Sequence, residues 1–195
     1  MDNLNEDFSF EKRSKIRIIS EFFWEMVRVG IISLAIILPV RYFLVQPFYV
    51  KGASMEPNFY DHEYLIIDEI SYRFNEPQRG DIVVFKYPLD DKQFFIKRVI
   101  GLPGETVKIK ENSVYINDTK LNESYLDINI ETFLPLRGYG DITLSDDEYF
   151  LLGDNRGQSF DSRSFGPVKK SLIIGRTWLR GWPFNRITVF NNPNY

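Results

Sequence analysis

The feature that most constrains the fold is an apolar run near the N-terminus, Met26–Val45. A helix of about 20 residues rises about 30 Å, which matches the thickness of the hydrocarbon layer of a bilayer. Arg28 and Arg41 lie near the two ends of the run, where long side chains reach the interface. Pro39 is expected to kink such a helix without preventing it. The run alone leaves a second interpretation open, a buried core helix of a soluble domain.

The residues before this run set the expected orientation. Basic residues cluster in the second half of this N-terminal segment, next to the apolar run: Lys12, Arg13, Lys15 and Arg17. Such residues hold the adjoining end of a membrane helix in the cytoplasm. The segment Gln46–Lys51 is bulky and lacks the small residues of a signal-peptide cleavage site, so we expect a retained anchor. The prediction is a cytoplasmic tail at 1–21, a single-pass transmembrane anchor at 22–45 and an extracytoplasmic domain at 46–195.

Beyond residue 46, short β-branched and aromatic runs alternate with turn residues, a pattern that favours strands. Strands are expected at Phe48–Lys51, Tyr64–Asp68, Asp81–Tyr87, Gln93–Ile100, Thr106–Lys110, Ser113–Asn117, Glu148–Leu152, Ile173–Leu179 and Arg186–Phe190. So many short strands predict a mainly β domain with an antiparallel, barrel-like sheet. Residues 118–147 are less regular and more acidic, and we expect them to form an inserted excursion from that sheet.

The composition of the chain excludes several kinds of catalytic and metal-binding site. The chain has no cysteine and one histidine, which excludes a thiolate nucleophile and cysteine-ligated or histidine-rich metal sites. A net charge of −3 provides no general attraction to nucleic acid. Neither a glycine-rich phosphate loop nor a metal-ligand spacing is present, so no cofactor and no metal are expected. The single histidine, His62, lies in a polar segment typical of a solvated loop, and its use as a catalytic base is the alternative.

Three stretches contain candidate residues of a catalytic site. Ser54 lies in Gly52–Pro57, where it is a candidate exposed nucleophile or part of an ordinary turn, and a serine hydroxyl needs a base to remove its proton. Lys97 lies in the apolar run Phe94–Ile100, where burial lowers a lysine pKa from about 10.4 by several units. An edge-strand lysine that reaches solvent is the alternative. The third stretch, Gly153–Val168, is dense in turn residues and paired charges, and either braces a site or is a solvated connection.

Taken together, these stretches resemble the bacterial type I signal peptidases, the membrane-anchored serine proteases that remove signal peptides from exported proteins. The resemblance covers nearly all of the chain past the tail. After the apolar run, it is carried by Arg41–Phe43, Gln46–Phe48, Gly52–Pro57, Arg79–Phe85, Lys97–Glu105 and Gly153–Gly166. The self-cleaving repressors, another Ser-Lys family, resemble the chain less, because they would carry a DNA-binding region in place of the anchor.

The resemblance implies a mechanism and a set of site residues. Ser54 would be the nucleophile, and Lys97, held neutral, would be the general base. Ser159 would hydrogen-bond the lysine amine and orient it. Asp161 and Arg163 would form a bracing ion pair that is structural rather than catalytic. Cleavage would follow an Ala-x-Ala-like site in exported preproteins, which with membrane lipid would be the partners.

The resemblance also implies how the substrate lies. It would extend between the segments Phe48–Gly52 and Gln93–Ile96, so that main-chain pairing supplies affinity. The groove residues would be Val50, Gly52, Phe95 and Ile96. A well-known variant of the family places a serine at the position of Gly52, where it binds the oxyanion. Here the oxyanion would rest on the backbone N–H of Ser54, and the second donor is not assigned.

A hypothesis from a different class is a catalytically silent, membrane-tethered module that binds exported peptides. Such a module would keep the groove and lose at least one residue of the reactive set. That set is present here as Ser54, Lys97, Ser159, Asp161 and Arg163. A labelled signal peptide distinguishes the two hypotheses, because a binding module would retain it uncut.

Overall fold

The computed structural model describes residues 3–39, 46–127 and 129–190, which form two compact units. The first unit, Met1–Phe43, contains one helix, α1 (Asn3–Pro39), whose large apolar side chains from Val29 to Leu38 are exposed. Within the described ranges, no helix has the combined length and hydropathy of a membrane-spanning segment. The predicted apolar run continues into residues 40–45, which lie outside the described residues.

The second unit, Leu44–Tyr195, is mainly β and antiparallel, as predicted. Its larger sheet has the order β1-β2-β11-β3-β4-β9-β10, with β12 paired to β11. These strands are β1 (Gln46–Tyr49), β2 (Tyr64–Asp68), β3 (Ile82–Tyr87), β4 (Asp90–Gly101), β9 (Glu148–Leu152), β10 (Val168–Lys169), β11 (Ile173–Trp182) and β12 (Thr188–Val189). Short helical turns connect them: α2 (Ser71–Phe74), α3 (Ser162–Phe165), η2 (Lys170–Leu172) and η3 (Phe184–Arg186).

The prediction of a barrel-like sheet is wrong for the described part of the chain. The strand path ends at β1 on one side and at β10 on the other, and these two strands do not pair with each other. Closure needs every strand to pair on both edges. Here β1 pairs only with β2, and the two-residue β10 pairs only with β9.

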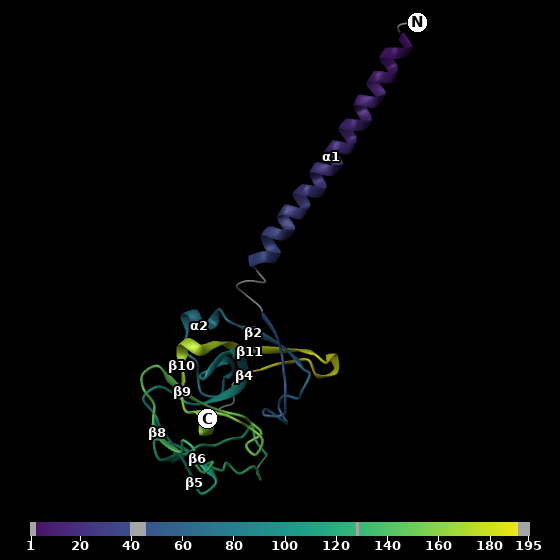
Figure 1. Ribbon diagram of the computed structural model, residues 1–195. Coiled ribbons are helices and arrows are strands. Elements are labelled where there is room, and N and C mark those ends of the chain that lie inside the picture. Colours follow the sequence, from purple (N-terminus) through teal and green to yellow (C-terminus); the bar gives the residue numbers. More distant parts are fainter. Residues whose placement is uncertain (1–2, 40–45, 128, 191–195) are drawn as a thin grey trace. The chain divides into compact units, whose positions relative to one another are not determined.

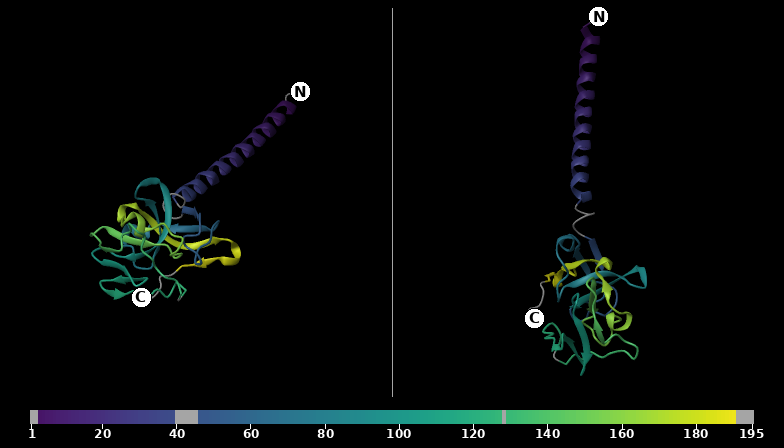
Figure 2. Two further views of the ribbon diagram at one scale, coloured as in Figure 1. Left: turned by 60° about the horizontal axis from the view of Figure 1, so that its bottom comes forward. Right: turned by 90° about the vertical axis from the view of Figure 1, so that its left-hand side faces the viewer.

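Residues 118–147 belong partly to a second sheet. It consists of β5 (Thr106–Lys110), β6 (Ser113–Ile116), β7 (Thr119–Lys120) and β8 (Asp141–Thr143), in the order β7-β6-β5-β8. Figure 1 shows β5, β6 and β8 together at the bottom of this unit, below β2, β4 and β11. The same teal and green strands lie at the lower edge in both views of Figure 2. The predicted excursion therefore contributes two short strands to a separate sheet.

Strand β4 is the element that positions the site. Successive side chains of a strand point to opposite faces. Val99 therefore packs in one core cluster with Phe85 and Leu151, whereas Ile100 packs in another cluster with the second sheet. β4 pairs with β3 between Asp90 and Arg98, but with β9 only from Arg98 onward. Within the described chain, the part of β4 before Arg98 thus has one unpaired edge.

Candidate active site

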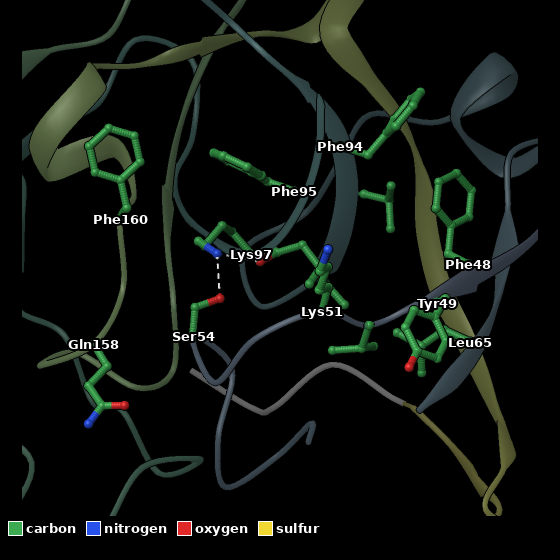
Figure 3. Close-up of a pocket in the computed structure, with 13 residues that line it drawn as sticks. Phe48, Tyr49, Lys51, Ser54, Leu65, Phe94, Phe95, Lys97, Gln158 and Phe160 are labelled. Carbon is green, nitrogen blue, oxygen red and sulfur yellow. Dashed lines mark hydrogen bonds between the residues drawn. The ribbon is translucent and has the colours of Figure 1, made fainter. Parts of the chain in front are cut away.

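The structure brings Ser54 and Lys97 into contact. Ser54 lies in the turn region that follows β1, and Lys97 lies in β4. The amine nitrogen Nζ of Lys97 donates to Oγ of Ser54 at 2.7 Å, as the dashed line in Figure 3 shows. The same nitrogen donates to the carbonyl oxygen of Ile96 at 2.8 Å. A hydroxyl and an amine at this distance are placed for direct proton transfer.

The surroundings of Lys97 favour its neutral form. The residue is only 3% exposed, and its amine lies 5.6 Å from the centre of the Phe95 ring. Burial lowers the pKa of the Lys97 amine to about 8, and the opposing effect of Asp161 and Asp154 is smaller. The cause is desolvation, because burial takes water away from the ammonium form. With this pKa about one lysine in ten is neutral at pH 7, whereas an exposed lysine is almost wholly protonated.

An open pocket of about 270 Å³ surrounds this pair. It is lined by Phe48, Tyr49, Val50, Lys51, Ser54, Leu65, Val84, Phe94, Phe95, Ile96, Lys97, Gln158 and Phe160. Three of the predicted groove residues, Val50, Phe95 and Ile96, belong to this lining. The fourth, Gly52, does not. Its N–H donates to Oδ1 of Asp61 at 2.8 Å, and its φ of +91° lies in the left-handed region that favours glycine.

The stretch after β9 holds the backbone around the serine. The N–H of Asn155 donates to the carbonyl oxygen of Ser54 at 3.1 Å, and its side-chain Nδ2 donates to that of Ala53 at 3.0 Å. Gly153 is packed closely against the same turn. A Cβ at Gly153 would lie 2.4 Å from the Ser54 carbonyl oxygen and 2.1 Å from Oγ of Ser159. A side chain at this position therefore requires the turn to move.

The predicted hydrogen bond between Ser159 and Lys97 is not formed in this structure. Oγ of Ser159 is buried and has no hydrogen-bond partner among the described residues. The Lys97 amine is bound instead to Ser54 and to the carbonyl oxygen of Ile96. Ser159 nevertheless lies next to the site, because its hydroxyl packs against Gly153.

Asp161 and Arg163 form a buried ion pair. Two parallel hydrogen bonds of 2.8 Å join the guanidinium to the two carboxylate oxygens. Asp161 also accepts from the N–H of Gly153 at 3.1 Å, and Arg163 donates to the carbonyl oxygen of Arg156 at 2.8 Å. These bonds tie α3 to the stretch that holds the serine turn. The arrangement is that of a brace, since neither side chain lines the pocket.

Comparison with known proteins identifies the family. The family model described as "Signal peptidase, peptidase S26" matches residues 23–182. This chain belongs to the signal peptidase family. It is therefore a peptidase, an enzyme that hydrolyses peptide bonds.

Named relatives agree with this assignment. The chain is 37% identical over 174 residues to "Probable signal peptidase I-2" of Synechocystis sp., which covers 86% of this chain and 77% of that protein. It is 36% identical over 186 residues to "Signal peptidase I P" of Bacillus subtilis subsp. natto, covering 92% and 97% of the two chains. A crystal structure of a signal peptidase I from Enterococcus faecalis V583 is 38% identical, with a TM-score of 0.45, and covers 52% of this chain and 97% of that chain.

Two side chains that brace this signal peptidase fold were not identified from the sequence. Asp154 accepts from Nε and Nη2 of Arg98 at 2.8 and 2.7 Å, and from the side chain of Asn58 at 2.8 Å. Glu123 accepts from both terminal guanidinium nitrogens of Arg156. These partners are far apart in the chain, so spacing carries no signal for them. Two hints were present: the paired charges of Gly153–Val168, which contains Asp154 and Arg156, and the acidity of residues 118–147, which contains Glu123.

The single histidine lies outside the Ser54–Lys97 pair. The side chain of His62 is 73% exposed, and its Nδ1 lies 2.8 Å from Oδ2 of Asp61. It does not line the pocket. This placement fits the predicted solvated loop histidine and gives it no contact with Ser54.

Proposed function

We propose that this chain is a serine endopeptidase that removes N-terminal signal peptides from exported preproteins, with Ser54 as nucleophile and Lys97 as general base. The observation that carries the proposal is the 2.7 Å contact between Ser54 Oγ and the Lys97 amine. Burial supports the assignment of the base, because it brings the pKa of Lys97 to about 8. Membership of the signal peptidase family supports the substrate class.

The contact supports a two-step reaction. With Lys97 neutral, the Ser54 hydroxyl donates to Nζ, and the lysine takes this proton as Oγ attacks the scissile carbonyl carbon. The protonated lysine then passes the proton to the leaving amine as the C–N bond breaks, which leaves an ester on Ser54. A water molecule attacks that ester and gives its proton to Lys97. Hydrolysis returns the proton to Ser54 Oγ and releases the signal peptide as a carboxylic acid.

The developing oxyanion is assigned to the backbone N–H of Ser54. Gly52 is not proposed as a second donor, because its N–H is already bound to Asp61 at 2.8 Å. Ser159 is proposed to orient the base. Its hydroxyl is buried, without a partner among the described residues, and close to the serine turn. It is therefore available to accept an N–H of the Lys97 amine after a small rearrangement.

Two unpaired strand edges support the proposed substrate path. β1 pairs only with β2, and β4 pairs only with β3 before Arg98, within the described chain. An extended peptide between these edges gains main-chain hydrogen bonds, and its alternate side chains enter the pocket. Branched side chains of Val50, Leu65 and Ile96 line that pocket. They leave room for small side chains, which supports cleavage after an Ala-x-Ala-like site.

We also propose that residues 22–45 form a single-pass membrane anchor, with the N-terminus cytoplasmic and the domain at 46–195 extracytoplasmic. Between Val29 and Leu38, α1 carries no charged residue, and its large apolar side chains are exposed. A helix that is apolar all round is usually buried in protein or in lipid. Alkaline extraction of bacterial membranes tests this. The full chain is expected in the membrane pellet, and recovery in the supernatant would contradict the anchor.

The function is tested by cleavage of a preprotein bearing an Ala-x-Ala site. Purified full-length protein in detergent is expected to cut after the second alanine. Ser54→Ala and Lys97→Ala are each expected to abolish cutting, whereas Lys169→Met, a matched change at an exposed lysine on β10, leaves it unchanged. Near-normal cutting by Lys97→Ala would contradict the assigned base. Retention of uncut substrate by the parent protein would indicate the silent binding module instead.

A further inference from the structure

The pocket extends beyond the Ser54–Lys97 pair on the side away from β1. Gln158 and Phe160 line this end. Figure 3 shows them on one side of the pair, and shows Phe48 and Phe94 on the other side. The site therefore has two ends, and the proposed substrate path between the edges of β1 and β4 accounts for only one of them.

The ring of Phe160 is held in place although it is 52% exposed. Its centre lies 5.5 Å from that of Phe165 and 6.0 Å from that of Tyr87. Tyr87 in turn stacks on Phe95 at 4.9 Å, and Phe95 lies beside the Lys97 amine. Aromatic contacts at these distances stabilise a fixed ring orientation. Phe160 thus presents a supported apolar face to the pocket, in continuity with the residues that bury the base.

We propose that Phe160 packs against the first residue of the mature protein, directly after the cleaved bond, and selects for its side chain. This inference rests on the proposed function. The scissile carbonyl carbon must lie at Ser54 Oγ, and the signal-peptide part lies between β1 and β4. The chain beyond the scissile bond must then continue toward Gln158 and Phe160. Phe160 is accordingly a specificity residue for the leaving part of the substrate.

The uncharged lining of the Gln158–Phe160 end of the pocket predicts which side chain it favours in the first mature residue of the substrate. Phe160 and Gln158, the described residues that line it, carry no charge. An apolar side chain that covers the exposed half of the ring removes apolar surface from water. A carboxylate in the same place loses hydration where neither Phe160 nor Gln158 offers it a cation, and it faces the negative face of the ring. The enzyme should therefore prefer leucine to aspartate as the first mature residue.

The test compares two preproteins that are identical except for leucine or aspartate as the first mature residue. The parent protein is expected to favour leucine in kcat/KM by about fivefold to tenfold, the scale of a partly buried apolar contact. Phe160→Ala is expected to bring the ratio close to one, and Phe160→Tyr, which retains the ring, to preserve it. Phe94→Ala alters the opposite end and is expected to lower both rates while leaving the ratio unchanged.

The outcomes separate this inference from the function on which it rests. If the parent protein cleaves neither preprotein, the proposed function fails and the inference fails with it. If the parent cleaves both and Phe160→Ala keeps the parent's ratio, the inference is overturned while the function stands. If Phe160→Ala is poorly folded by thermal melting, Phe160→Leu replaces it. That variant should show a reduced ratio, and an unreduced ratio would overturn the inference.

Discussion

Lys97 and Arg98 are adjacent, buried cations on opposite faces of β4, and they differ in the partners that their charged groups contact. The Lys97 amine meets a hydroxyl and a carbonyl oxygen, and no carboxylate in the described chain forms a salt bridge with it. Arg98 makes two hydrogen bonds of 2.7 and 2.8 Å to Asp154, with a third to the carbonyl oxygen of Gly80. Pairing keeps the arginine charged and structural, whereas desolvation without pairing turns the lysine into a base.

One short stretch, Asp154 and Asn155, contacts the residues on both faces of β4. Asp154 binds Arg98 on one face of β4, and the next residue, Asn155, binds the backbone of Ala53 and Ser54 on the other. The ion pair therefore fixes the position of the stretch that in turn positions the nucleophile. The comparison between the two cations thus predicts different consequences for removing each one.

Removal of the Arg98 charge should have the largest effect on stability. Arg98→Met leaves the carboxylate of Asp154 buried without this partner, which costs about 3–5 kcal/mol of unfolding free energy. Urea denaturation measures this cost. The double variant Arg98→Met with Asp154→Leu should recover most of it, because no uncompensated charge remains. A loss below about 1 kcal/mol for the single variant would mean that the pair is not a structural brace.

Removal of the Lys97 charge should have the opposite sign. Its folded pKa of about 8 lies below the unfolded value of 10.5, so the penalty is complete below pH 8 and disappears as pH rises to 10.5. Lys97→Met should therefore stabilise the protein by about 3 kcal/mol at pH 7, with a diminishing advantage above pH 8. Urea denaturation at pH 7 and pH 10 checks this. A destabilised variant at pH 7 would contradict an unpaired, desolvated lysine.

The same pKa predicts the pH dependence of activity. Cleavage requires neutral Lys97, so kcat/KM should rise about tenfold per pH unit well below pH 8 and level off above it. A pH series with one preprotein measures the profile. The control variant Lys169→Met should reproduce it, since that lysine is exposed. A flat profile between pH 6 and pH 9 would show that Lys97 does not act as the base.

The smallest expected effect tests the link between the two faces. Asn155→Ala removes the hydrogen bond from Nδ2 to the Ala53 carbonyl oxygen, at a cost of about 1 kcal/mol. It should also lower kcat more than it raises KM, because the nucleophile turn is held less firmly. Asn75→Ala, which removes an exposed bond to the Ser71 carbonyl oxygen, is the matched control and should leave kcat unchanged. Equal kcat for both variants would mean that Asn155 does not position the turn.

Much of the fold follows from local pattern. Short β-branched and aromatic runs between turn residues predicted β2, β5 and β9 with their observed bounds. It did not predict the second sheet, because β7 and β8 are only two and three residues long and have little periodicity of their own. The predicted barrel failed for a different reason. Closure depends on which strands pair, and strand pairing is not a local property.

The sequence by itself determined that a serine in a tight turn, a lysine in an apolar strand and a charged loop occur together. Local residue type and spacing are sufficient for that. Only the tertiary structure decided that Arg98, and not the adjacent Lys97, is paired with a carboxylate, because Arg98 finds its partner at Asp154, far along the chain. It also showed that Ser159 and Lys97 form no hydrogen bond in this structure and that Gly52 lies outside the pocket lining. These properties depend on burial and on distant partners, which exist only after the chain has folded.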